Sequence, residues 1–320
     1  MQNENLNAAG MGLLLAVDAG GTKASYLLAD GERELGRVRG GSIKRMRVPA
    51  ETAVQHLEEA LAELSALTGR SLAEVGCTCI GTAGNTVPLV TDWLRAEFGR
   101  RVGGKLLLLG DVEIALDAAF PGQPGILVLA GTGSNVMGRS AAGELVGAGG
   151  YGPALADQGS GHRIGEQALR ALFLARDEGR STCLYEAILA ATHQGSYSDL
   201  VVWANSCPQS EFSPLAQVVN ECAEAGDAVA LSVLEKEGEE LAELALLIHR
   251  RLKEIDGAAW KPRFAFAGSI LENVRTLRAA LIAAVEREAP GSQFLPGVID
   301  PLQGALWRAR QYAADCARTA

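Results

Sequence analysis

The stretch LLLAVDAGGTKASYLLAD, Leu13–Asp30, joins two apolar runs through a short turn with two glycines. Such a pair of runs predicts a β-hairpin. Backbone N–H groups in a tight glycine turn can point together at an anion, and the missing Cβ atoms let a phosphate come close. Asp18, near the end of the first run, would repel that phosphate unless Mg²⁺ lay between them. We interpret Asp18 and the turn at 20–23 as half of a nucleotide-phosphate and metal site; the alternative is a plain hairpin with a solvated aspartate.

The same pattern returns in GILVLAGTGSNVMGRS, residues 125–140, where an apolar run meets the turn at 131–135 and a second run follows. The Gly-Thr steps at Gly21 and Gly131 lie roughly 110 residues apart (131 minus 21), which suggests two related halves. Two such turns on facing halves would supply both sides of a phosphate site. The pattern GxxxxGK[ST] does not occur, so the predicted cradle is of another kind.

The composition is that of a globular protein with room for two domains. The chain has 320 residues, of which 21% are charged and 48% hydrophobic, and a formal net charge of −9. This acidity argues against nucleic acid or an anionic membrane as the main partner. No apolar run is long enough to span a bilayer, and the first ten residues lack the marks of a secretory signal. We therefore expect a cytoplasmic protein.

The six cysteines are scattered and form no CxxC pair, which argues against a zinc site and against a disulfide scaffold. We expect mostly reduced thiols. Cys77 and Cys79 should face one side of a predicted strand, and we interpret them as buried small hydrophobic residues.

Strand-like and helix-like segments alternate in the first half of the chain, and the second half is mostly helical. Residues 39–51, RGGSIKRMRVPAE, form a basic and irregular piece. Besides the hairpins, strands are predicted within 75–85, 105–111 and 263–270. Helices are predicted at 50–69, 91–99, 112–122, 164–178, 182–193, 212–225, 227–252 and 273–289, with a last one after Pro301.

Asp111 follows the apolar run KLLLLG, at the carboxyl end of a predicted strand, where α/β sheets bind their ligands. Its carboxylate could be the general base that accepts a hydroxyl proton during phosphoryl transfer. The position also suits an N-cap of the helix that follows, which is the alternative interpretation.

Two further stretches combine glycine with polar residues. In residues 147–169, GAGGYGPALADQGSGHRIGEQAL, Asp157 and Ser160 could hydrogen-bond a polyol beside the flat ring of Tyr151. Ser160 could equally cap the next helix, and we interpret His162 as a surface or packing residue because no second ligand lies at metal-binding spacing. In FAFAGSI, residues 264–270, the turn could carry adenine or be an ordinary strand–helix turn.

Together these motifs resemble the sugar-kinase, Hsp70 and actin superfamily, and within it the BadF/BadG/BcrA/BcrD ATPase family, most closely its N-acetylglucosamine kinases. VDAGGTK is similar to the first phosphate motif, LAGTGSN to the second and FAGSI to the adenosine motif. GGYGPALADQGSGHRIG resembles the glycine-rich stretch of the family, and residues 223–245 resemble its Gly-Asp helix. The resemblance runs from about Leu13 to Trp307.

The implied fold is α/β, with two ribonuclease-H-like (actin-like ATPase) domains and a nucleotide and sugar cleft between them. The N-terminal domain would span 1–122, with a C-terminal helix at 302–318 packed on it. The C-terminal domain would span 123–301 and carry a helical insertion.

Carried over by position, the resemblance implies a role for each matching residue. Asp111 would be the base that activates the sugar 6-hydroxyl, and Asp18 would hold Mg²⁺. The residues implied to contact ATP are Asp18, Gly20, Gly21, Thr22, Lys23, Gly131, Thr132, Gly133, Ser134, Gly268 and Ser269. The residues implied to line the sugar are Ser42, Lys44, Asn135, Gly150, Tyr151, Gly152, Asp157 and Ser160.

The sequence departs from the family pattern at the implied sugar site. In GSIKR, Lys44 stands where the family has the Asn of Ser-x-Asn, Tyr151 replaces the usual Trp, and Ala156 and Gln158 flank Asp157. An ammonium group donates hydrogen bonds but cannot accept them, and it can meet a carboxylate or a phosphate instead. Glucosamine, N-acetylmuramic acid and other hexoses therefore stay open beside N-acetylglucosamine. Lys44 could also be solvated in a basic surface loop.

The favoured function is an ATP-dependent kinase that transfers the γ-phosphoryl of ATP to the 6-hydroxyl of an amino sugar, N-acetylglucosamine first. One alternative is an ATPase that acts on a protein partner. The activators of this kind hold an iron–sulfur cluster through cysteines near the second phosphate motif, and no cysteine lies between Cys79 and Cys183. The other alternative, a non-catalytic sugar sensor, is disfavoured because Asp18 and Asp111 are both present. The resemblance also implies a homodimer.

Overall fold

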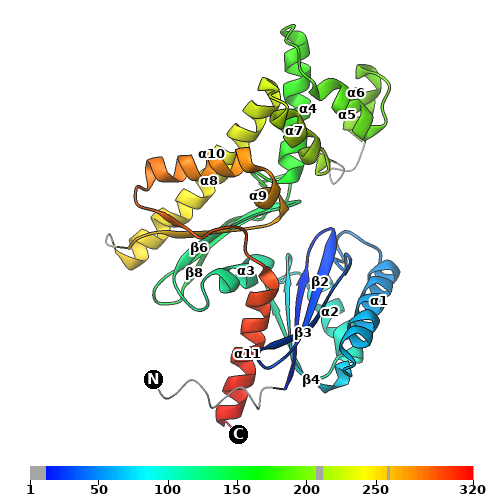
Figure 1. The fold of residues 1–320 in the computed structure, drawn as a ribbon, viewed down its shortest axis with the longest axis vertical. Coiled ribbons are helices and arrows are strands. Elements are labelled where there is room, and N and C mark those ends of the chain that lie inside the picture. Colours follow the sequence, from blue (N-terminus) through cyan, green and yellow to red (C-terminus); the bar gives the residue numbers. More distant parts are fainter. Residues whose placement is uncertain (1–11, 207–211, 258–259, 320) are drawn as a thin grey trace. The chain divides into compact units, whose positions relative to one another are not determined.

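The computed structural model describes residues 12–206, 212–257 and 260–319, which divide into two compact units (Figure 1). Unit 1 holds the chain up to Gly122 and again from Ile299, and unit 2 holds Gln123–Val298. Cys207 and residues 1–10, for which the sequence supports expectations, lie outside the described residues. Each unit is built on one five-stranded sheet with helices packed against it.

The sheet of unit 1 has the strand order β3-β2-β1-β4-β5. Its strands are β1 (Leu13–Ala19), β2 (Lys23–Asp30), β3 (Arg33–Gly41), β4 (Val75–Thr82) and β5 (Lys105–Leu109). The predicted hairpin is present as the antiparallel pair β1–β2, and β1, β4 and β5 run parallel. The sequence pattern does not predict β3, because charged residues and glycines fill this edge strand and only Val38 is buried in it.

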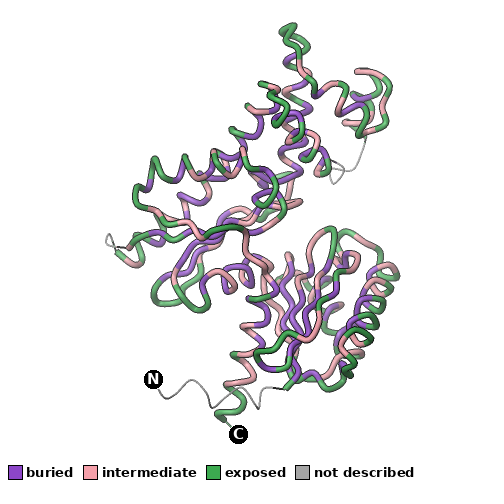
Figure 2. Tube along the Cα trace, in the orientation of Figure 1, coloured by how far each residue is buried: buried purple, intermediate pink, exposed green. Residues whose placement is uncertain are grey.

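Four α-helices and one short 3-10 helix complete unit 1. They are α1 (Ala50–Thr68), η1 (Leu72–Glu74), α2 (Pro88–Arg101), α3 (Asp111–Ala119) and α11 (Pro301–Thr319). Successive side chains of β1 point to opposite faces of the sheet. Leu13, Leu15 and Val17 pack on the face that α1 and α2 cover, and Leu14 and Ala16 pack on the face that α3 and α11 cover. Both faces of the central strand are therefore buried (Figure 2).

Helix α11 brings the end of the chain back to unit 1, where it packs against α3, β1 and β4. A Cβ atom at Gly304 would overlap the backbone carbonyl oxygen of Ile114, so glycine allows the close approach of α11 to α3. Cys77 and Cys79 are buried in the same cluster, which confirms that they act as small hydrophobic residues. The five described cysteines are free thiols.

The sheet of unit 2 repeats the plan of unit 1, with the strand order β10-β9-β6-β7-β8. Its strands are β6 (Gly125–Ala130), β7 (Ser134–Arg139), β8 (Leu145–Gly149), β9 (Arg263–Ala267) and β10 (Gln293–Phe294). The second predicted hairpin is the antiparallel pair β6–β7, and β6, β9 and β10 run parallel. The strands β8 and β10 are too rich in glycine or too short to be predicted from sequence.

Unit 2 carries most of the helices. They are α4 (Gly161–Asp177), α5 (Leu184–Thr192), α6 (Tyr197–Ser206), α7 (Leu215–Glu224), α8 (Ala228–Asp256), α9 (Ser269–Asn273) and α10 (Arg275–Glu288). Helix α6 is not predicted from the sequence. The helix predicted at 273–289 corresponds to α10, and the separate short helix α9 precedes it, with Val274 between the two. The long helix α8 begins where expected, because the Asp227 carboxylate accepts the N–H groups of Val229 and Ala230 at 3.0 and 2.9 Å.

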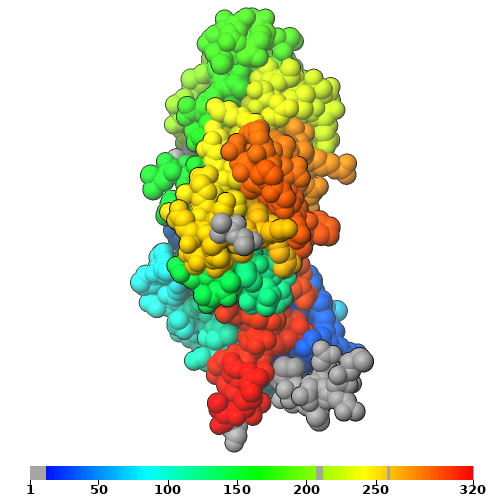
Figure 3. Space-filling view, turned by 90° about the vertical axis from the view of Figure 1, so that its left-hand side faces the viewer, coloured from blue at the N-terminus to red at the C-terminus, as the bar shows by residue number. Residues whose placement is uncertain are grey.

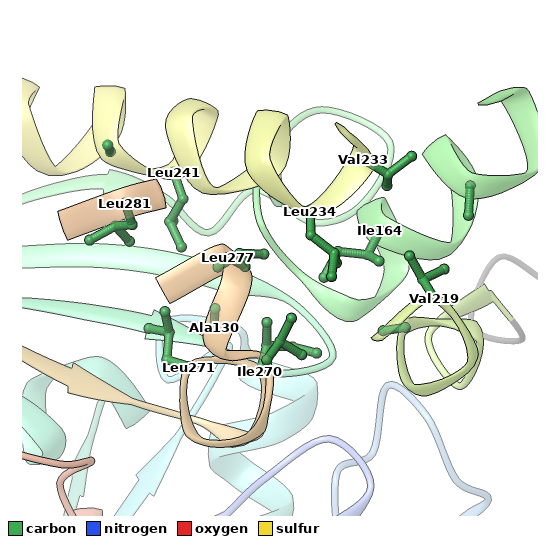
Figure 4. Packing of buried hydrophobic residues seen from close by; sticks show 14 of the residues in the cluster. Ala130, Ile164, Val219, Val233, Leu234, Leu241, Ile270, Leu271, Leu277 and Leu281 are labelled. Atoms are coloured by element: carbon green, nitrogen blue, oxygen red, sulfur yellow. The ribbon is translucent and has the colours of Figure 1, made fainter. Parts of the chain in front are cut away.

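Helix α8 is the centre of the unit 2 core. It lies beside α10, as the space-filling view shows, and it also contacts α4, α7 and the sheet (Figure 3). Leu234 and Leu241 of α8 pack with Leu277 and Leu281 of α10 and with Ile164 of α4 (Figure 4). None of the helices in the described residues combines the length and the apolar content that crossing a membrane requires.

Candidate functional site

The first glycine turn lies between β1 and β2 in unit 1. Gly20 and Gly21 are half-buried there, whereas Thr22 and Lys23 are exposed. The Ser42 hydroxyl donates a hydrogen bond to the carbonyl oxygen of Gly20 at 3.1 Å and ties the turn to the loop after β3. The four predicted phosphate-binding residues at 20–23 therefore lie on one short turn, and the hydrogen bond from Ser42 to Gly20 fixes its backbone.

The loop that follows β3 brings basic side chains next to this turn. The Lys44 N–H donates to the Ser42 hydroxyl at 3.2 Å, and the Lys44 carbonyl accepts the N–H of Arg47 at 2.8 Å. The Arg47 side chain lies over Gly21, with its Nε 3.4 Å from the place of a Cβ atom. His56 of α1 supports the loop, since its Nδ1 lies 2.9 Å from the Ser42 carbonyl oxygen.

Asp111 is the first residue of α3, just after β5. Its Oδ1 accepts the N–H of the neighbouring Val112 at 2.9 Å, and the N-cap of the helix is Gly110. The alternative interpretation of Asp111 as the N-cap is therefore wrong, because the helix begins one residue earlier than that role requires. Burial raises the pKa of Asp111, while the Val112 N–H and the ammonium of Lys44 act in the opposite direction.

Asp18 lies near the carboxyl end of β1, at the same sheet edge as Asp111. β1, β4 and β5 are parallel, so their carboxyl ends meet at that edge. Burial, together with the nearby carboxylates of Asp111 and Asp300, raises the pKa of Asp18 to about 7, and Lys23 acts in the opposite direction. Asp300, just before α11, thus joins the group, although no local sequence pattern indicates it.

These carboxylates are suitable donors for Mg²⁺. The described residues contain no cluster of three or more His, Cys, Asp or Glu side chains that could hold a metal by themselves. Mg²⁺ does not need one, because it keeps several waters and binds one or two carboxylates together with substrate phosphates. The repulsion between Asp18 and Asp111 is of the kind that a divalent cation relieves.

The second glycine turn lies between β6 and β7 in unit 2 and is firmly attached to its surroundings. The Gly131 N–H donates to the Gly133 carbonyl at 2.9 Å, and the Gly131 carbonyl accepts the N–H of Gly161 at 2.8 Å. The carbonyl of Thr132 accepts the N–H of His162 at 3.4 Å. The Ser134 hydroxyl donates to the Gln158 carbonyl at 2.7 Å. The turn and the loop before α4 therefore form one connected unit.

Asp157 faces this turn. Asp157 has a left-handed backbone conformation (φ 70°) and is only 5% exposed. Its Oδ1 accepts the Ser134 N–H at 3.4 Å. A Cβ atom at Gly133 would lie 3.0 Å from its Oδ2, so the carboxylate lies against the turn. Its role toward a sugar stays a prediction.

The remaining residues predicted to line the sugar fall into two groups. Asn135 of β7 pairs with Gly149 of β8, and a Cβ atom at Gly150 would lie 2.5 Å from the Asn135 Nδ2, so Asn135 and Gly150 are in contact. Tyr151 is 71% exposed beside them, and Gly152 follows with φ 87°. Ser160 lies apart from this group, buried at the start of α4.

Ser160 caps α4, because its Oγ accepts the N–H of Arg163 at 3.1 Å. The capping interpretation is therefore confirmed, and contact with a sugar stays a prediction. His162 is buried and packs against Phe212 at 5.5 Å between ring centroids, which confirms its packing role.

The turn predicted to carry adenosine lies beside the second glycine turn. β9 runs parallel to β6, and Gly268 follows it with φ 95°. A Cβ atom at Gly268 would overlap the Ala130 carbonyl oxygen, so only glycine fits there. The Ser269 hydroxyl lies 3.9 Å from the place of a Cβ atom on Gly131. The structure thus brings the two motifs together from positions far apart in the chain.

Known proteins match this chain along almost its whole length. The model of the BadF/BadG/BcrA/BcrD ATPase family matches residues 15–309. The N-acetylmuramic acid/N-acetylglucosamine kinase of Clostridium acetobutylicum is 29% identical over 275 residues, 83% of this chain and 88% of that protein. The N-acetyl-D-glucosamine kinase of Dictyostelium discoideum is 25% identical over 313 residues, 92% of this chain and 96% of that protein.

A solved structure from Chromobacterium violaceum, provisionally named an N-acetylglucosamine kinase, has the same fold. Its TM-score is 0.73 at 24% identity, over 93% of this chain and 99% of that one. The fold class implied by the resemblance, two α/β domains of the actin-like ATPase type, is confirmed by this likeness and by the two sheets of equal strand order. The family expectation is confirmed as well: the chain belongs to the BadF/BadG/BcrA/BcrD ATPase family.

Proposed function

We propose that this protein is an ATP-dependent sugar kinase, which transfers the γ-phosphoryl group of ATP to the 6-hydroxyl of an amino sugar. N-acetylglucosamine is the first candidate. Membership of an ATPase family supports the use of ATP. The two relatives named for N-acetylglucosamine, at 29% and 25% identity over most of the chain, support the substrate class.

The observation that carries the proposal is the pairing of carboxylates with a glycine turn at one sheet edge. Asp18 lies at the carboxyl end of β1 and Asp111 just after the parallel strand β5, and their charges interact. In this proposal, Asp111 would accept the proton of the sugar hydroxyl as that oxygen attacks phosphorus. Asp18 would hold Mg²⁺, whose charge neutralises the phosphate oxygens when it is bound.

Backbone N–H groups and hydroxyls would do most of the phosphate binding. Gly20–Lys23 would contribute from unit 1 and Gly131–Ser134 from unit 2. Neutral donors fixed in advance stabilise negative charge without reorganising during the reaction. The adjacency of Gly268 and Ser269 to Gly131 supports their assignment to the adenosine of the same nucleotide. A homodimer stays a prediction, which light scattering of the purified protein would test.

Lys44 is the residue that we propose decides between sugars. Its charge acts on the half-buried Asp111, so its ammonium lies near the proposed catalytic base. An ammonium at this place would suit a sugar with a carboxylate, as in N-acetylmuramic acid. The Clostridium acetobutylicum relative is named for both sugars, which supports testing the two side by side.

The test is ADP release with Mg-ATP and a panel of N-acetylglucosamine, N-acetylmuramic acid, glucosamine, N-acetylmannosamine and glucose. Turnover that depends on one of these sugars, with phosphate found on its 6-hydroxyl, is the expected result. Slow ATP hydrolysis that no sugar changes would contradict the kinase and would favour an ATPase that acts on a protein partner.

The variant Lys44→Asn tests the choice of sugar, with Lys105→Asn as the matched control at the exposed opposite end of β5. If Lys44 binds a sugar carboxylate, Lys44→Asn lowers kcat/KM for N-acetylmuramic acid about tenfold relative to N-acetylglucosamine, because a charge-assisted hydrogen bond is lost. An unchanged ratio would assign Lys44 to solvent.

A further inference from the structure

Glu237 is a buried acidic residue in the middle of α8, and the sequence motifs assign it no role. Its side chain is 1% exposed. Its Oε2 accepts the N–H of Gly159 at 2.8 Å. Gly159 has φ 71°, and a Cβ atom there would lie 2.9 Å from Cβ of Leu241 and 3.2 Å from the Glu237 carbonyl oxygen. The backbone of the loop before α4 therefore lies directly on α8.

The other carboxylate oxygen of Glu237 faces α4. Its Oε1 lies 3.4 Å from Nε of Arg163, a charge contact outside hydrogen-bond geometry. Arg163 also approaches Glu240 at 3.4 Å and Glu166 at 3.9 Å. One carboxylate thus contacts the loop through Oε2 and the helix after the loop through Oε1.

A buried carboxylate is costly for the folded state. Burial raises the pKa of Glu237 to about 7, against the effects of the Gly159 N–H and of Arg163. An apolar residue of similar size would stabilise a packed helix at least as well. The position therefore provides something other than stability, namely an acceptor for the loop backbone.

The loop that Glu237 holds is the one attached to the second phosphate turn. On one side of Gly159, the Gln158 carbonyl accepts the Ser134 hydroxyl at 2.7 Å. On the other side, the Gly161 N–H donates to the Gly131 carbonyl at 2.8 Å. Helix α8 is itself fixed in the core through residues such as Leu234 and Leu241 (Figure 4). A continuous series of contacts leads from the core, through Glu237, to the phosphate turn.

We propose that Glu237 is a positioning residue for phosphoryl transfer, which from α8 holds the loop at 157–161 and, through it, the turn at 131–134. It does not touch substrate; it fixes the backbone groups that do. The inference rests on the proposed function, since a positioning role needs a reaction to position. Phosphoryl transfer is sensitive to such placement, and a displacement of about 1 Å can lower a rate about 100-fold.

Hydrogen exchange and kinetics on the full-length protein test this role. Glu237→Ala removes the acceptor, Glu237→Gln keeps an oxygen that can accept the Gly159 N–H, and Glu239→Ala is the matched control on the exposed face of α8. Amide exchange is measured on peptides that cover 131–135 and 157–162. ADP binding, kcat and KM are measured on the same samples.

In Glu237→Ala we expect exchange more than about tenfold faster in both segments, because a hydrogen bond to a charged acceptor is lost. We expect kcat/KM about 100-fold lower, with KM for ATP raised and kcat reduced. Glu237→Gln should recover most of the protection and most of the activity, and Glu239→Ala should match the wild type.

Unchanged exchange in both segments of a folded Glu237→Ala protein would overturn the inference. So would faster exchange with unchanged kcat and KM, because the loop would then not matter for the reaction. If Glu237→Ala does not fold, the test rests on Glu237→Gln. A folded Glu237→Gln protein that loses protection in both segments more than about tenfold and kcat/KM about 100-fold would also overturn the inference, because its amide oxygen can still accept the Gly159 N–H. A wild type that phosphorylates no sugar contradicts the proposed function, while the exchange data still report whether Glu237 holds the loop and the turn.

Discussion

The two glycine turns occupy the same place in sheets of the same strand order, yet their chemistry differs. In unit 1, Asp18 lies two residues before the first glycine of the turn; in unit 2 that position is Leu129. The first turn is one residue longer, because Ala19 pairs with Ala24 whereas Ala130 pairs with Ser134. A duplicated hairpin has thus kept its backbone plan while only unit 1 carries a carboxylate at the strand end.

The surroundings differ as well. The turn of unit 1 has a hydrogen bond from Ser42 at Gly20, and its Thr22 and Lys23 are exposed. The turn of unit 2 is bonded along its length to the loop at 157–162. The carboxylates differ too, since Asp18 and Asp111 are half-buried at the sheet edge of unit 1, whereas Glu237 is fully buried beneath a loop in unit 2. The turn of unit 1 therefore lies near ionisable side chains, whereas the turn of unit 2 is fixed by hydrogen bonds within its own unit.

The largest expected effect is that of Asp111→Asn, which removes the base from unit 1. We expect kcat to fall about 10²- to 10⁴-fold, the usual contribution of general acid–base catalysis. Nucleotide binding should remain, because Asp111 is not one of the proposed phosphate ligands. ADP release and calorimetric ADP binding measure the two effects, with the exposed Asp92→Asn as the control. Unchanged turnover would remove Asp111 from the base role.

The next effect concerns Glu237 and the dependence of stability on pH. Its folded pKa of about 7 lies above the unfolded value of 4.5. Between these values the unfolded chain has lost a proton that the folded chain keeps, so stability falls as pH rises from about 4.5 to 7 and stays low above that. The shift corresponds to roughly 3 kcal/mol.

Glu237→Gln should remove this loss, because Gln does not titrate and still offers an oxygen to Gly159. The nearby charged groups Arg163, Glu240 and Glu166 are unchanged in the variant. Urea unfolding of wild type and variant between pH 5 and pH 8 measures the difference. If the free energy of unfolding depends on pH in the same way in wild type and variant, the pKa of the Glu237 carboxylate is not raised.

A smaller effect is expected from Gly304→Val in α11. The new side chain would overlap the carbonyl oxygen of Ile114 and force α11 away from α3. Overpacking of this kind costs about 1–3 kcal/mol. Fluorescence of Trp307, which lies in α11, should report a lower unfolding midpoint for unit 1, and Gly99→Val, where no atom lies near the added group, serves as the control. Equal midpoints would show that α11 and α3 can separate without cost.

The smallest effect compares the two turns directly. A Cβ atom on Gly133 would lie 3.0 Å from Oδ2 of the buried Asp157, whereas one on Gly21 would lie 3.4 Å from the exposed, flexible Arg47. We expect Gly133→Ala to lower stability by about 1 kcal/mol and Gly21→Ala to stay within about 0.5 kcal/mol of the wild type. Denaturant unfolding without nucleotide measures the stability of both variants. A larger loss of stability in Gly21→Ala than in Gly133→Ala would show that the turn of unit 1 is the more rigid one.

Local patterns in the sequence predict the central features of both sheets. Alternation and apolar content indicate β1, β2, β6 and β7, and glycine between two such runs indicates a turn. Asp18 and Asp111 are found from sequence because each lies at the end of an apolar run. That Gly268 lies next to the second turn can be expected only from the family resemblance, because no local sequence pattern predicts that the strand near position 265 pairs with β6.

Other features depend on contacts between distant residues and have no local signal. β3 and α6 lie at edges where burial is slight, so their sequences lack a clear period. The left-handed backbone conformation of Asp157 places its carboxylate against Gly133. Glu237 is one of several acidic residues on the long helix α8. Nothing in the sequence around it says that it will be buried under Gly159.

Local residue patterns are enough to predict the hairpins, the glycine turns and the carboxylates at the strand ends, because strand period and turn chemistry act within a few residues. The contacts between distant residues come from the packing of each unit: Asp18 with Asp111 and Asp300, the second turn with the loop at 157–162, and that loop with Glu237. Such meetings depend on how helices pack against a sheet, and packing is a property of the whole unit, since each contact exists only when the surrounding core is complete.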